Sequence, residues 1–154
     1  MNVPLTTINI IQAMLAPGLM ISACGLLILG MNNKYSMVVG RIRMLNEERR
    51  RIGRAVEEAQ RKRLENIGRQ LAELLHRLRL VRNAVVSYGA AVALFIISSL
   101  FIGLRILAGA EWPASLALGL FVVGMLTVLV GIGFAASEAL MGYRIIQLEV
   151  EAGP

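Results

Sequence analysis

The sequence contains no aspartate, one cysteine and one histidine, and these absences exclude several classes of protein. A single cysteine forms no disulfide within the chain, and one cysteine with one histidine falls short of the ligand set of a structural zinc site. No Gly-x-Ser-x-Gly, phosphate-loop or His-Glu-x-x-His motif occurs in the chain. We therefore expect no enzyme activity, no cofactor and no bound metal.

Charged residues are also absent from three long stretches, which predict membrane spans. Residues 13–31, 84–104 and 113–136 form runs of 19, 21 and 24 residues without a charge. About 20 helical residues cross a hydrocarbon core of about 30 Å, and a backbone in lipid has to make its hydrogen bonds within a helix. These runs predict an all-α membrane protein with three transmembrane helices.

The basic residues are distributed unequally around these spans, and this asymmetry predicts the orientation. Fourteen of the 16 lysines and arginines lie in residues 31–83, and Arg144 falls on the same side of the membrane. Arg105 alone falls on the other side. The positive-inside rule then places the N-terminus outside, and residues 31–83 and the C-terminus in the cytoplasm.

The segment between the first two spans has apolar residues at alternating spacings of three and four, which is typical of a coiled-coil seam. The two series are 42, 45, 49, 52, 56 and 64, 67, 71, 74, 78, 81. Because both ends return to the membrane, we expect an antiparallel hairpin that turns near Gln60. Arg49 takes a seam position, which predicts a hydrated layer or a facing carboxylate. No proline interrupts residues 31–83, so both arms should be continuous with the spans.

Four segments follow from these patterns. Residues 1–35 should form the first transmembrane helix, 36–83 the cytoplasmic coiled-coil hairpin, 84–136 the second and third transmembrane helices, and 137–154 the cytoplasmic tail. The apolar residues of the tail are spaced to extend the third helix and to dock it on the hairpin.

The most concentrated basic cluster consists of Arg49, Arg50, Arg51 and Arg54. Glutamates interleave with the basic residues, and no aromatic residue accompanies them for base stacking, so we expect no nucleic-acid binding. Topogenic bias and attraction to anionic lipid account for the surplus of positive charge. We expect these arginines to contact anionic lipid headgroups or an unidentified protein partner of the hairpin.

Small residues recur along the third span and predict close helix packing. Ala117, Gly124, Gly131 and Glu138 repeat every seven residues, and Thr127 flanks them. Small residues let helix backbones approach in lipid, either within one three-helix bundle or between copies of the chain. Because the second span carries small residues too, we expect a homo-oligomer, a pentamer being one candidate.

In such an oligomer, Gly124, Thr127, Gly131 and Glu138 would line an axial pore. A ring of Glu138 carboxylates at its cytoplasmic mouth would favour cations. An ordinary interfacial carboxylate is the simpler interpretation of Glu138. The alternative function is a non-conducting scaffold or assembly protein whose hairpin recruits a partner.

Three segments of the first half resemble a known family. They are IQAMLAP at 11–17, ISACGLL at 21–27 and RIRMLNE at 41–47. The chain resembles, over nearly its whole length, the bacterial membrane family catalogued as domain of unknown function 2721. The resemblance implies a small protein of the bacterial inner membrane and supplies no functional residues to carry over. The topology is also similar to that of the ExbB, TolQ and MotA stator proteins, an analogy of fold alone.

Overall fold

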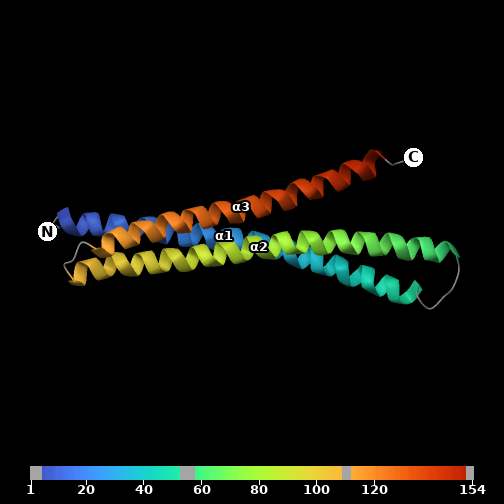
Figure 1. The fold of residues 1–154 in the computed structure, drawn as a ribbon, viewed down its shortest axis with the longest axis horizontal. Coiled ribbons are helices and arrows are strands. Elements are labelled where there is room, and N and C mark those ends of the chain that lie inside the picture. Colours follow the sequence, from blue (N-terminus) through green and yellow to red (C-terminus); the bar gives the residue numbers. More distant parts are fainter. Residues whose placement is uncertain (1–4, 53–57, 109–111, 152–154) are drawn as a thin grey trace. The chain divides into compact units, whose positions relative to one another are not determined.

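The chain forms three long α-helices in a computed structural model (Figure 1). α1 covers Leu5–Ile52, α2 covers Glu58–Ala108 and α3 covers Trp112–Glu151. The structure describes these three ranges, and within them it contains no strand. Each helix includes a stretch long and apolar enough to cross a membrane. The prediction of an all-α chain with three potential spans is confirmed.

α1 and α2 both continue from an apolar run into the charged segment. They contain 48 and 51 residues, so each is more than about 70 Å long at 1.5 Å per residue. The predicted continuity of the two arms is confirmed, and so is the extension of the third helix, since α3 continues to Glu151. α1 ends at Ile52 and α2 begins at Glu58, so the change of helix falls a few residues before Gln60, near which the turn was expected. Residues 53–57, including Arg54, lie outside the described residues.

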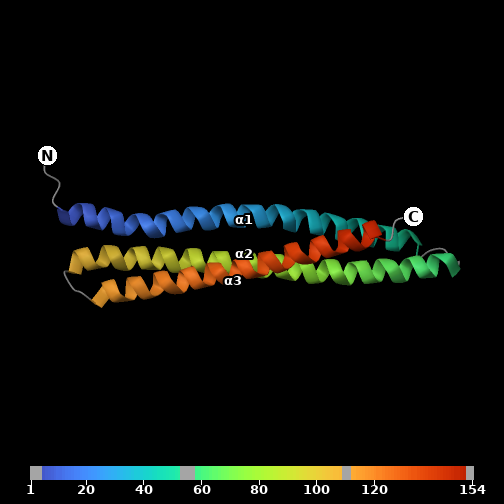
Figure 2. The same cartoon turned by 90° about the horizontal axis from the view of Figure 1, so that it is seen from above.

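The helices divide into two compact units along their length. Unit 1 consists of residues 1–29 and 84–133, and unit 2 consists of residues 30–83 and 134–154. In unit 1, the apolar segments of the three helices lie side by side (Figures 1 and 2). Unit 2 contains the charged ends of α1 and α2 and nearly half of α3, from Phe134 onward.

The core of unit 1 is a seam in which buried residues alternate at spacings of four and three on α2 and recur at spacings of seven, four and three on α3, as in a coiled coil. Buried residues of α2 and α3 in this seam are Ala84, Tyr88, Ala91, Phe95, Ser98, Ala117, Gly124, Val128 and Gly131. A Cβ atom at Gly124 would lie 2.7 Å from Cε1 of Phe95, and one at Gly131 would lie 2.6 Å from Cε1 of Tyr88. Glycine is therefore what lets these two aromatic rings reach the backbone of α3.

The outward surface of unit 1 is apolar. Leu26, Leu100 and Leu118 are 72%, 66% and 66% exposed, and they come from three different helices. Large exposed apolar surfaces are rare on soluble monomers and mark contact with a membrane or a partner. This surface fits the hydrocarbon of a bilayer.

In unit 2, buried apolar residues again follow heptad spacing, with Met31 and Val38 on α1 and Ile67 and Val81 on α2. This spacing is compatible with a coiled-coil hairpin. An ion pair joins the two arms, in which Nη2 and Nε of Arg63 donate to Oε1 of Glu48 at 2.9 and 3.1 Å.

The seam position expected of Arg49 is wrong, because Arg49 is exposed and its neighbour Glu48 makes the contact between the arms. Where neighbouring positions of a heptad both carry charged side chains, as Glu48 and Arg49 do, the pattern does not show which of the two faces the other arm.

Candidate functional site

Glu138 is the one charged residue that is buried within the described ranges. It lies on α3, two residues after the uncharged run of residues 113–136, and seven residues after the buried Gly131. Helix geometry therefore turns it to the packed face of α3. Its side chain is 2% exposed. An isolated carboxylate in such a position would be strongly destabilising, so its partners determine what the site can do.

Two cations from two other helices neutralise this carboxylate. Nζ of Lys34, on α1, donates to Oε2 at 2.9 Å. Nη2 and Nε of Arg77, on α2, donate to Oε1 at 2.6 and 3.2 Å. Both carboxylate oxygens are thus occupied, and one side chain of α3 is tied to both other helices of unit 2. We call Glu138, Lys34 and Arg77 the ion-pair cluster.

The two cations of the ion-pair cluster differ in their access to solvent. The side chain of Lys34 is 42% exposed, whereas that of Arg77 is 25% exposed. A Cβ atom at Gly142 would lie 3.0 Å from Nη2 of Arg77, so the guanidinium lies close against α3 one turn after Glu138. Arg77 is therefore the better fixed partner, and Lys34 is the one that can also reach water.

A cavity of about 520 Å³ adjoins the ion-pair cluster within unit 2. All three helices contribute to its lining, which includes Lys34, Arg41, Arg77, Glu138 and Met37. Three cations face one carboxylate, so these side chains carry a formal surplus of two positive charges. We call this space the basic cavity.

The residues expected to line a pore take up other positions within one subunit. Gly124 and Gly131 are covered by aromatic side chains of α2, and Glu138 is held in the ion-pair cluster. The hydroxyl of Thr127 donates to the carbonyl of Val123 at 2.8 Å, on its own helix. A carboxylate paired with two cations supplies no net negative charge to attract cations. Pore lining by these four residues stays a prediction.

The basic cluster on the first arm lies on the surface. Arg49, Arg50 and Arg51 are exposed, and Arg51 Nη2 pairs with Oε1 of Glu47 at 2.8 Å. Arg49 and Arg50 have no ion pair to any residue that the structure describes. The arrangement leaves them available to a ligand or partner, and their predicted contacts with lipid or protein stay untested.

Sequence reasoning identified Glu138 and missed both of its partners. A signal for one of them is present, because Arg77 precedes Ala84 by one heptad and so continues the series of buried residues on α2. Lys34 lies three residues after the buried Met31 and four before the buried Val38. A cation in phase with a buried seam indicates a buried anion opposite it.

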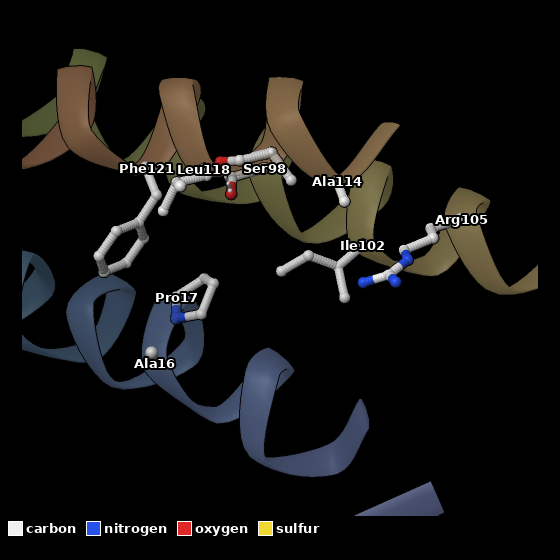
Figure 3. Close-up of a pocket in the computed structure, with 9 residues that line it drawn as sticks. Ala16, Pro17, Ser98, Ile102, Arg105, Ala114, Leu118 and Phe121 are labelled. Carbon is white, nitrogen blue, oxygen red and sulfur yellow. Dashed lines mark hydrogen bonds between the residues drawn. The ribbon is translucent and has the colours of Figure 1, made fainter. Parts of the chain in front are cut away.

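A second cavity, of about 330 Å³, lies among the three helices of unit 1 (Figure 3). Figure 3 shows Pro17, Ile102 and Phe121 around it, with Arg105 at one end. The hydroxyl of Ser98 in its wall donates to the carbonyl of Ala117 at 2.7 Å. Its lining is mostly hydrocarbon and contains no pair of titratable groups that could exchange a proton.

Over the described part of the chain, no three histidine, cysteine or carboxylate side chains gather as metal ligands would. A family model described as "Protein of unknown function (DUF2721)" matches residues 14–148. That range includes the ion-pair cluster and the basic cavity. No curated protein and no solved structure matches the chain.

Proposed function

We propose that this chain, which belongs to the DUF2721 family of proteins of unknown function, is a non-conducting scaffold of the bacterial inner membrane. Its function is to hold a charged helical hairpin in the cytoplasm for a protein partner. The observation that carries this proposal is the unbroken passage of α1 and α2 from an apolar run into a charged one. Each arm of the hairpin is thus joined to its apolar run without an intervening loop, as a scaffold requires.

Contacts within unit 2 hold the two arms of the hairpin to each other and to α3. The pair of Glu48 with Arg63 joins the two arms, and the ion-pair cluster joins both arms to α3. An exposed pair contributes little, whereas a buried and fully bonded carboxylate stabilises one arrangement of its helices over others. α3 therefore stabilises the two arms of the hairpin where Lys34 and Arg77 contact Glu138.

The exposed arginines at 49–51 are the proposed recognition surface. Arginine binds carboxylates through two parallel hydrogen bonds, and exposed charge chiefly accelerates and orients encounter with a complementary partner. The partner chemistry that fits is an acidic segment of another protein. In the proposed orientation, with the N-terminus outside, this segment is cytoplasmic.

Cross-linking in intact membranes tests the scaffold directly. Charge reversal of all three arginines at 49–51 should abolish the cross-link to a specific neighbour, identified by mass spectrometry. The matched control reverses Arg69, Arg79 and Arg82, which are exposed on the second arm and change the net charge equally. The control should retain the cross-link. If both variants retain it, or both lose it, the arginines at 49–51 are not the recognition surface.

A homo-oligomeric, ion-conducting protein is the second candidate, and exposed small residues favour the oligomer. Gly89, Ala93, Ser115 and Gly119 are exposed in the subunit, and a Cβ atom at either glycine would meet nothing within 4 Å. Spacings of small-xxx-small on an apolar surface let helices of two subunits approach. Native mass spectrometry of the solubilised complex tests this candidate. A ring of four to six chains supports it, and a monomer eliminates an axial pore.

A further inference from the structure

We infer that the basic cavity of unit 2 binds the phosphate of an anionic phospholipid, which goes beyond the proposed scaffold function. The cavity, of about 520 Å³, is within the range of small-molecule sites and is lined from all three helices. Lys34, Arg41 and Arg77 line it together with Glu138. A phosphodiester headgroup is the ligand class that the charges and surroundings of this cavity fit.

The cations around the cavity have more hydrogen-bond donors than Glu138 uses. Arg77 has five N–H groups and donates hydrogen bonds from two of its nitrogens to the carboxylate. Lys34 has three N–H groups and donates a hydrogen bond to one carboxylate oxygen. Arg41 lines the cavity without an ion pair to any residue in the described ranges. Phosphate oxygens are strong acceptors for these donors, and Arg41 would be the first to bind them.

The position of the cavity favours a lipid over a soluble anion. Lys34 and Glu138 follow the uncharged runs 13–31 and 113–136 by three and two residues. Headgroup phosphates lie at this depth, and basic pockets between helices at the membrane surface are typical headgroup sites. Met37, which lines the cavity, is 68% exposed, so apolar surface is available to the glycerol and acyl groups.

Lipid binding by the purified full-length protein tests the inference. Phosphatidylglycerol and phosphatidylcholine are each titrated into detergent-solubilised protein, and bound lipid is counted by native mass spectrometry. Arg41→Gln should weaken phosphatidylglycerol binding about tenfold, which is the size of one charge-assisted contact. Arg43→Gln removes the same charge from an exposed position outside the cavity lining, and it should change binding less than twofold.

Equal loss in the two variants would mean diffuse attraction to the surface and would overturn the inference. Equal binding of phosphatidylcholine would overturn it as well. Glycerol phosphate, added at the concentration of the lipid, should not displace phosphatidylglycerol. Displacement would assign the cavity to a soluble anion instead.

A photoreactive phosphatidylglycerol gives a readout on the unaltered protein, independent of how the variants fold. The expected products are labelled peptides that contain Met37 or Ala139, both of which line the cavity. Labelling confined to other peptides would place the lipid elsewhere and would contradict the inference. Salt at high concentration should reduce labelling, because the contact depends on charge.

Discussion

Replacing Glu138 by glutamine removes the charge that holds Lys34 and Arg77 while nearly preserving the shape of the side chain. Glutamine keeps one acceptor oxygen and introduces two N–H donors, which face cations that cannot accept a hydrogen bond. The two cations then lose their only ion-pair partner among the described residues. We expect the end of α3 beyond residue 133 to separate more readily from the two arms.

The size of this effect follows from the exposure of each partner. Arg77 is 25% exposed and makes two hydrogen bonds to the carboxylate, a charge-assisted contact of about 1.5–3 kcal/mol. Lys34 is 42% exposed and can turn to water, so its pair contributes about 0.5 kcal/mol. With the lower end of the range for Arg77, the two contacts together give a loss of about 2 kcal/mol in the free energy of local opening, an increase of about 30-fold in the open population.

Hydrogen–deuterium exchange of the protein in lipid nanodiscs measures this opening. Peptides covering residues 134–142 should exchange about 30-fold faster in Glu138→Gln than in the unaltered protein. Glu65→Gln is the matched control, because that carboxylate is 76% exposed and makes only a 3.5 Å pair with Arg69 on the same helix. The control should change exchange by less than about threefold.

An effect of Glu138→Gln no larger than that of Glu65→Gln would mean that the ion-pair cluster does not hold α3 against the two arms. The double variant Glu138→Gln with Arg77→Gln sharpens the test. Because it also removes the uncompensated cation, it should open no more readily than Glu138→Gln alone. A double variant that opens much more readily would show that Arg77 stabilises the helices through contacts other than Glu138.

Two further substitutions test the core of unit 1, each by the thermal midpoint in detergent. Gly131→Ala places a Cβ 2.6 Å from Tyr88 and should destabilise by about 1–3 kcal/mol, whereas Gly133→Ala meets nothing within 4 Å and should be neutral or stabilising. Equal midpoints for the two would contradict the packing of α3 on α2. Ser98→Ala removes the 2.7 Å hydrogen bond to the carbonyl of Ala117 and should cost about 1 kcal/mol. An unchanged midpoint would mean that this buried bond adds nothing.

The three helices were predictable because lipid leaves the backbone few alternatives. A run of 19 to 24 uncharged residues without internal hydrogen bonds would be unstable in hydrocarbon, so length and composition alone determine the helix. The heptad series from Ala117 to Glu138 likewise predicts one face of α3. The same periodicity could not tell whether another helix of the subunit or another copy of the chain covers that face.

The partners of Glu138 could not be predicted from the sequence alone. Lys34 and Arg77 are 104 and 61 residues away in the sequence, and many other cations lie in the same segment. Pairing at such separations depends on the rotation of each helix about its axis, which a heptad pattern fixes only to within about one residue. That uncertainty also explains why Arg49 was predicted at a seam position where Glu48 makes the contact.

Cation conductance of the reconstituted protein in planar bilayers distinguishes a scaffold from a pore, since a scaffold with a neutralised Glu138 carries no current. We expect no conductance above that of protein-free bilayers, for either the unaltered protein or Glu138→Gln. A cation-selective current in the unaltered protein that loses its selectivity in Glu138→Gln would contradict it. Such a result would place the carboxylate in a conducting path instead of the ion-pair cluster.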